Sequence, residues 1–156
     1  MKVLKLFLVL TVPILASCAN SEKSPSLTMG ETVLPIKPSG ELVRGYALSD
    51  DFIDVDFKAV EYANVNPAAR SEDVTEEDRA KMKAAVYRFN KHVSVVDGLY
   101  YCSIKNGAEI NISEDLFKYM IDNLDEMNGF IKEYTEKGEN VDVIEPTEEY
   151  LESLLK

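Results

Sequence analysis

The residue types of a hydrolase triad occur within one short stretch of the sequence, at His92, Ser103 and Glu109. An antiparallel meander over residues 93–112 would set His92, the only histidine in the chain, across from Ser103, and Ser103 across from Glu109. A serine hydrolase needs the histidine in the middle, because one imidazole must both accept the proton and be oriented by the acid. Here the serine would stand in the middle of a flat sheet face. We therefore expect a solvated polar row and assign no catalytic residue.

Cys102 is a second nucleophile candidate on the same predicted strand. Successive side chains of a strand point to opposite faces, so Cys102 would face the core while His92 faces away from it. A cysteine–histidine pair is therefore not expected. Cys102 is predicted to be a buried thiol that behaves as a small hydrophobic side chain.

Two acidic clusters could offer oxygen ligands to a hard cation such as calcium. The first consists of Asp50, Asp51, Asp54 and Asp56, and the second of Asp122, Asp125 and Glu126. The first has the spacing of no calcium loop, and the second falls on the polar face of a predicted helix. A pair of catalytic carboxylates would meet in space rather than in sequence, and no pair stands out. We predict no metal ligand and no cofactor-binding residue.

Tyrosine is the dominant aromatic residue, with eight tyrosines and no tryptophan. Tyr101 falls on the outer face of the predicted sheet, beside Leu99. Exposed aromatic side chains can anchor a protein partner. Tyr101 and Leu99 are therefore the candidate surface contacts.

Two helices are expected to position these residues. Thr75, with Asp78 three residues later, predicts the start of a helix over about residues 76–91. Ser113 predicts the start of another over about residues 114–136, where apolar residues recur at spacings of three and four.

The chain beyond these helices predicts two short elements. Val141–Ile144 is a strand candidate, and Thr147 is expected to cap a short amphipathic tail helix.

The stretch between the two helices predicts a β-hairpin. The Asp97-Gly98 dipeptide favours a two-residue turn, which pairs Val95 with Tyr100 and Val93 with Cys102.

A second turn at Asn106-Gly107 allows two registers. A two-residue loop would set Ile110 opposite Ser103, whereas a three-residue loop with a bulge at Gly107 sets Ile110 opposite Cys102. We adopt the second register because only it collects one apolar face. The expected core face consists of Val93, Val95, Tyr100, Cys102, Ile104, Ala108, Ile110 and Ile112.

The region before the first helix predicts a further hairpin. Leu42–Leu48 has strand-like content, and Phe52–Tyr62 alternates apolar and polar residues. The predicted fold class is therefore α+β. It has a three-stranded antiparallel meander (about 93–112) packed on two helices (about 76–91 and 114–136), with an additional N-terminal hairpin.

The N-terminus carries a targeting pattern. Lys2 and Lys5 precede an apolar run of about ten residues, which ends at Leu15-Ala16-Ser17-Cys18. The pattern resembles a bacterial lipoprotein signal peptide with Leu15–Cys18 as its lipobox. The resemblance implies cleavage before Cys18 and diacylglycerol and palmitate on that cysteine. An ordinary secretory signal is the alternative, and a short run containing Pro13 disfavours a retained transmembrane anchor.

The resemblance divides the chain into three parts. Residues 1–17 would be the signal peptide, 18–40 the lipidated cysteine and a flexible tether, and 41–156 a single α+β domain. The Val33–Ile36 patch could instead dock on the domain. Ala19, rather than an acid, follows the cysteine, which resembles lipoproteins sent to the outer membrane of the cell envelope.

The charge of the chain limits its partners. The formal net charge is −11 over 156 residues, which argues against binding nucleic acid. We expect a lipid-anchored envelope protein that acts as a non-enzymatic binding or accessory module, with the membrane and a protein as partners. The alternatives are an envelope-held inhibitor or immunity protein against a secreted toxin or wall hydrolase, and an enzyme with a carboxylate-based site.

Overall fold

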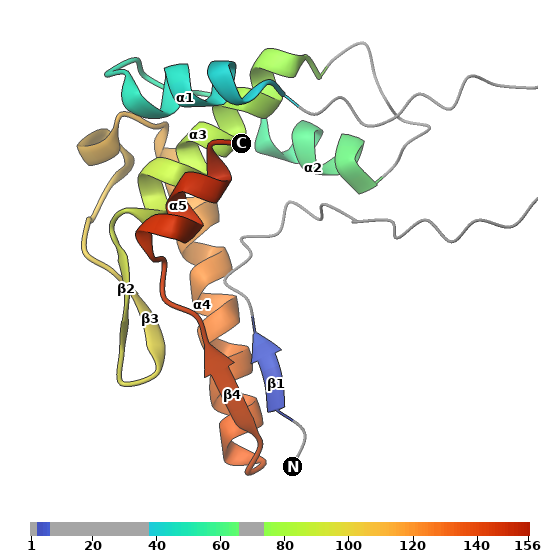
Figure 1. Ribbon diagram of the computed structural model, residues 1–156, viewed down its shortest axis with the longest axis vertical. Coiled ribbons are helices and arrows are strands. Elements are labelled where there is room, and N and C mark those ends of the chain that lie inside the picture. Colours follow the sequence, from blue (N-terminus) through green and yellow to red (C-terminus); the bar gives the residue numbers. More distant parts are fainter. Residues whose placement is uncertain (1–2, 7–37, 66–73) are drawn as a thin grey trace, which may run out of the picture.

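The computed structural model describes residues 3–6, 38–65 and 74–156, and these residues form a mostly helical α+β fold (Figure 1). The helices are α1 (Gly40–Leu48), α2 (Phe57–Val65), α3 (Glu76–Asn90), α4 (Glu114–Glu136) and α5 (Glu148–Leu154). The strands are β1 (Val3–Leu6), β2 (Val93–Val96), β3 (Leu99–Cys102) and β4 (Asn140–Val143). β2 and β3 form an antiparallel hairpin, and β1 runs parallel to β4.

The other elements of the fold are arranged along the long helix α4. Figure 1 shows α1, α2, α3 and α5 near one end of α4, β4 beside its other end, and the β2–β3 hairpin along its flank. No helix in the described part of the chain is long and apolar enough to cross a membrane. Apart from β1, the predicted signal peptide, lipidated Cys18 and most of the tether lie outside the described residues.

The predicted N-terminal hairpin is wrong, because this region forms the helices α1 and α2. The Ser39 hydroxyl accepts a hydrogen bond from the N–H of Leu42 at 3.2 Å, and the Asp56 carboxylate accepts one from the N–H of Ala59 at 3.0 Å. These are N-cap interactions, which favour helices over strands. The alternating residues between Phe52 and Tyr62 therefore reflect a loop and a capped helix rather than a strand.

Burial at helical spacing explains why α1 and α2 pack as helices. Val43 and Ala47, four residues apart, are buried on α1, and Val60 and Ala63, three apart, are buried on α2. Between these helices only Ile53 keeps a strand-like contact.

The hairpin is confirmed with its predicted register. Val95 lies opposite Tyr100, and Val93 lies opposite Cys102. The Asp97-Gly98 turn has positive φ at both residues, 52° and 77°, which two-residue hairpin turns of this type require.

The predicted third strand is wrong. Residues Gly107–Ile110 form a short 3₁₀-helix, η2, and Asn111 adopts a left-handed conformation with φ of 54°. Cys102 therefore has no strand partner at Ile110, and Ala108 is exposed rather than in the core. Of the expected core face, four residues are buried and three are half-buried. The buried ones are Val93, Tyr100, Ile110 and Ile112, and the half-buried ones are Val95, Cys102 and Ile104.

Local contacts explain the departure from a strand at η2. The Gly107 N–H donates to the Glu114 carboxylate at 3.0 Å, and the Glu109 carboxylate accepts from the N–H of Lys105 at 2.8 Å. The outer edge of β3 is occupied by α4 instead. The Asn128 amide accepts from the Tyr100 N–H and donates to the Tyr100 carbonyl, both at 2.8 Å.

The predicted helices α3, α4 and α5 are confirmed, as is a strand at β4. Thr75 and Asp78 form a reciprocal capping box at the start of α3. Thr147 caps α5, whereas the Ser113 side chain makes no capping hydrogen bond at α4.

Arg88 on α3 is a charged residue inside the core, with only 7% of its surface exposed. Its guanidinium donates to the backbone carbonyls of six residues at 2.5–3.4 Å. They are Tyr46, Ala47, Ser49, Asp51, Ile110 and Asn111. The first two belong to the last turn of α1, whose carbonyls have no partner within the helix and attract a cation. Arg88 thus joins α1, the chain that follows it, and the end of η2 to α3.

Arg88→Met should lower the free energy of unfolding by about 3 kcal/mol or more, because several buried carbonyls lose a charged donor. Arg44→Met is the matched control. The Arg44 side chain is 47% exposed and pairs with Glu152 at 2.9 Å, so its loss should cost less than about 1 kcal/mol. Urea unfolding followed by circular dichroism measures both. Similar small losses in the two variants would contradict the role given to Arg88.

Candidate functional site

A groove of about 790 Å³ opens where the loop before α2 meets the first turns of α3 and α4. Aspartates are the commonest residues in its lining. The lining consists of Asp54, Val55, Asp56, Phe57, Lys58, Asp78, Ser113, Asp115, Lys118, Tyr119 and Asp122.

The two sides of the groove are joined by backbone pairing. Ile53 donates to the Asn111 carbonyl at 2.8 Å, and its own carbonyl accepts from the Ser113 N–H at 2.9 Å. This isolated parallel bridge to Ile112 sets Asp54 next to the start of α4. Because Arg88 binds the carbonyls of Asp51 and Asn111 on either side of the bridge, it also fixes the groove.

An aromatic pair forms part of the wall. The rings of Phe57 on α2 and Tyr119 on α4 stack with centroids 4.3 Å apart. The Tyr119 hydroxyl donates a hydrogen bond to the Glu61 carboxylate on α2. Burial and this carboxylate raise the pKa of Tyr119 to about 12, so its hydroxyl is neutral and serves as a donor at physiological pH.

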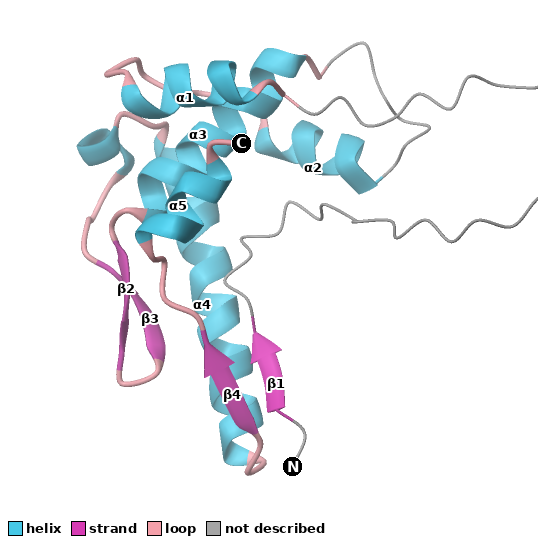
Figure 2. Ribbon diagram, in the orientation of Figure 1, coloured by secondary structure: helices cyan, strands magenta, loops and turns pink. Residues whose placement is uncertain are grey.

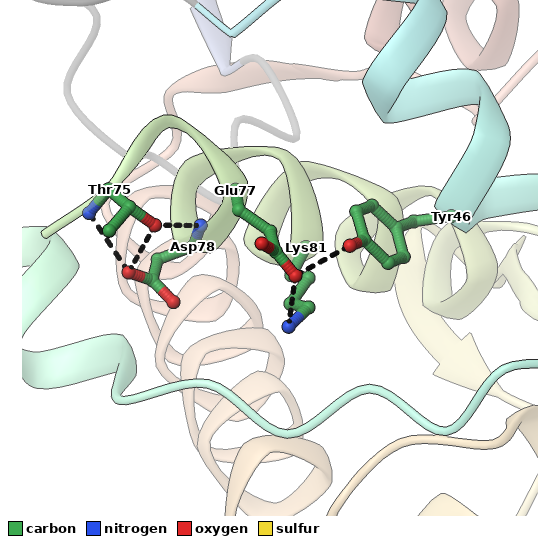
Figure 3. A network of polar contacts seen from close by, with 5 residues as sticks. All are labelled: Tyr46, Thr75, Glu77, Asp78 and Lys81. Carbon is green, nitrogen blue, oxygen red and sulfur yellow. Dashed lines mark hydrogen bonds and ion pairs between the residues drawn. The ribbon is translucent and has the colours of Figure 1, made fainter.

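The α3 side of the groove carries an acidic residue whose position is set by a cap (Figure 3). Asp78 accepts hydrogen bonds from both the N–H and the hydroxyl of Thr75, at 2.9 and 2.7 Å. The neighbouring Glu77 accepts from the Tyr46 hydroxyl at 2.6 Å and pairs with Lys81 at 2.8 Å. Lys81 and Tyr46 hold the pKa of Glu77 below its usual value. The first turn of α3 is thereby tied to α1.

The charge of the groove is negative. Five aspartates line it against two lysines, Lys58 and Lys118. Acidic residues near the starts of three helices complement the helix dipoles, which offsets part of their mutual repulsion. Within the described ranges, no three His, Cys, Asp or Glu side chains converge so that they could hold a metal ion. The groove can therefore attract cationic side chains, with the aromatic pair as an apolar wall.

The polar row predicted from the sequence forms only in part. Ser103 lies across from His92, with its N–H and hydroxyl both donating to the His92 carbonyl at 2.9 and 3.2 Å. Glu109 is not across from Ser103, because it caps the loop before η2. The structure does not assemble these three side chains into a catalytic site.

Cys102 is half-buried rather than fully buried, and its thiol contacts the Ile104 carbonyl at 3.8 Å. Burial raises the pKa of Cys102 above its usual value, which lowers its nucleophilicity at neutral pH.

The acidic clusters are divided between two places. Asp54, Asp56 and Asp122 line the groove, whereas Asp125 and Glu126 are exposed on α4 outside it. Burial lowers the pKa of Arg88, and Asp51 and Asp50 near its guanidinium offset part of that effect. Of the candidate surface contacts, Tyr101 is 58% exposed and Leu99 is half-buried.

Sequence reasoning missed the aromatic wall and the buried arginine. Phe57 and Tyr119 lie far apart in the chain, so no local pattern links them. The sequence does contain one indication of α2, namely Asp56, because Asp is a preferred N-cap residue immediately before a helix. Arg88 lies within an apolar helix face, next to the fully buried Phe89, and a charge in that place indicates a buried partner.

The pH dependence of stability tests the Tyr119 environment. An unfolded tyrosine ionises near pH 10, whereas folded Tyr119 keeps its proton up to about pH 12. The stabilisation by Tyr119 is therefore complete below about pH 10 and is lost as pH rises towards about 12. Tyr119→Phe should show a shallower loss over this interval in urea unfolding. Equal slopes in the Tyr119→Phe variant and the unsubstituted protein would contradict the prediction.

The comparisons with known proteins identify no relative. No protein-family model, no curated protein and no solved structure matches the chain.

Proposed function

We propose that the protein is a lipid-anchored protein of the bacterial cell envelope that acts as a non-enzymatic binding module. The acidic groove is its binding surface, and its partner is a protein that presents lysine or arginine side chains. The main support for this proposal is the lining of the groove, which has five aspartates and only two lysines next to the stacked rings of Phe57 and Tyr119.

The anchor is supported by the sequence around Cys18. Leu15-Ala16-Ser17-Cys18 resembles a lipobox, and the residue after the cysteine is Ala19, which favours the outer membrane. Cleavage before Cys18 would remove β1 from the mature chain and leave residues 19–37 between the lipid and the first described residue, Pro38.

The binding role is supported by where the acids are and what holds them. Asp56 and Asp78 are engaged in helix caps, whereas Asp54 and Asp122 make no described hydrogen bond. The second pair is therefore free to bind an external cation. Charge pairs across such a surface accelerate association and select partners by charge.

An inhibitor or immunity role is the second candidate, and the same groove favours it. A basic toxin or wall hydrolase would be attracted both by the groove and by the overall charge of −11. Such a role requires that the bound enzyme lose activity, whereas an accessory module leaves its partner active.

The anchor is tested at Cys18. In a bacterial host the mature protein should carry diacylglycerol and acyl mass at its N-terminus by mass spectrometry. Cys18→Ser should abolish that mass, and Cys102→Ser should retain it, because only the first cysteine lies in the lipobox. Unsubstituted mature protein without lipid would overturn the anchor.

The groove is tested with an oligolysine peptide and isothermal titration calorimetry. Replacing Asp54 and Asp122 with Asn should weaken binding about tenfold, and added salt should weaken binding to the unsubstituted protein. The matched control replaces Glu139 with Gln and Asp142 with Asn, which removes the same charge near β4, away from the groove. The control should bind within about twofold of the unsubstituted protein. Equal weakening in both variants would show that overall charge, and not the groove, attracts the peptide.

A further inference from the structure

The two strands of the hairpin differ in how their outer edges are covered. The two-residue turn makes Val96 and Leu99 a hydrogen-bonded pair, and the bond from the Ser103 N–H to the His92 carbonyl continues the same alternation. Tyr100 and Val95 lie directly opposite each other. Their N–H and carbonyl groups therefore point away from the partner strand of the hairpin. Each strand thus has one outer edge at which these backbone groups can bond to another element.

The β3 edge is hydrogen-bonded to α4, whereas the β2 edge makes no such bonds. Asn128 of α4 satisfies both backbone groups of Tyr100. Among the described residues, no hydrogen-bond partner reaches the N–H and carbonyl of half-buried Val95, nor those of Val93, of which only 7% is exposed. β3 is also the strand that lies against α4, whereas β2 has no comparable contact outside the hairpin (Figure 2).

The open edge lacks the features that normally prevent strands from pairing. Proteins protect edges with lysine, proline or bulges, whereas β2 reads Val-Ser-Val-Val without a charge. On the outer face of the hairpin, Val96 is 52% and Tyr101 is 58% exposed. A strand that added to this edge would extend the sheet and cover part of this apolar surface.

We propose that β2 pairs with β2 of a second copy of this chain, antiparallel and about a two-fold axis at Ser94. This register sets Val93 opposite Val95 of the second copy, and each such pair can exchange two backbone hydrogen bonds. The result is a four-stranded sheet in the order β3, β2, β2 and β3, which has no open edge at its centre.

Charge complementarity favours a second copy as the occupant. Lys91 lies two residues before β2 and Asp97 directly follows it, and both are exposed. Antiparallel pairing about Ser94 brings the Lys91 end of one copy next to the Asp97 end of the other, twice per dimer. A two-fold interface must be complementary to itself, and opposite charges at the two ends of one strand meet that condition. This inference is independent of the anchor and of the groove.

Disulfide formation tests the register directly. The test uses the full chain with Cys18→Ser and Cys102→Ala, so that any introduced cysteine is the only thiol. Ser94→Cys should form a disulfide-linked dimer with diamide, because the two positions face each other on the axis with Cα atoms about 4.5 Å apart, within disulfide range. Val96→Cys is the matched control on the same exposed face. In this register the two Val96 positions lie about 13 Å apart, so it should not cross-link.

Sedimentation across micromolar concentrations tests the dimer without a cross-link. The unsubstituted chain should associate to a dimer, and Ser94→Lys should raise the dissociation constant about tenfold or more, because two lysines would face each other on the axis. Ser94 is exposed, so the melting temperature of the dilute Ser94→Lys variant should not change. A chain that stays monomeric, or cysteines at 94 and 96 that cross-link equally, would overturn the proposal. A monomer that binds a strand of another protein at β2 would overturn the choice of a second copy.

Discussion

The guanidinium of Arg88 is the contact on which much of this fold depends. It is almost fully buried and is held by backbone carbonyls of two segments that are far apart in sequence, residues 46–51 and 110–111, and no carboxylate of the described residues contacts it directly. Removing an arginine from water is costly, and the penalty is offset here by a planar fork of donors that fills many acceptor positions at once. The negative end of α1 adds a favourable interaction with the charge. A lysine would present a single point of charge and could not bind the carbonyls of both segments at once.

The groove is a consequence of that arrangement. Arg88 holds the carbonyls of Asp51 and Asn111, and between these positions the Ile53–Ile112 bridge joins the loop before α2 to the start of α4. The helix caps at Asp56 and Asp78 then fix two of the acids in place. Asp56 and Asp78 therefore carry charge in the groove and also hold helix caps, whereas Asp54 and Asp122 carry charge there without a described hydrogen bond.

A side chain takes the place of a strand at the hairpin. Asn128 offers one acceptor and one donor to Tyr100, which is what a third strand would have offered at that position. This contact closes one side of a two-stranded sheet that would be marginal alone. It leaves the other side, at Val95, available for a second sheet. The shape of the hairpin edge therefore follows from a single amide on a neighbouring helix.

The sequence alone determined the elements whose signals are local. The Thr75–Asp78 capping box, the apolar stripe of α4 and the Asp97-Gly98 turn each act within a few residues, and α3, α4 and the hairpin form where these signals predict. Tertiary contacts decided the rest. Residues 108–112 could have continued the sheet, but Asn128 occupies that edge. The 52–62 stretch alternates like a strand, but its cap and its burial against α3 and α4 make it a loop and a helix. The groove could not be predicted, because its walls come from segments that only Arg88 and the Ile53–Ile112 bridge bring together.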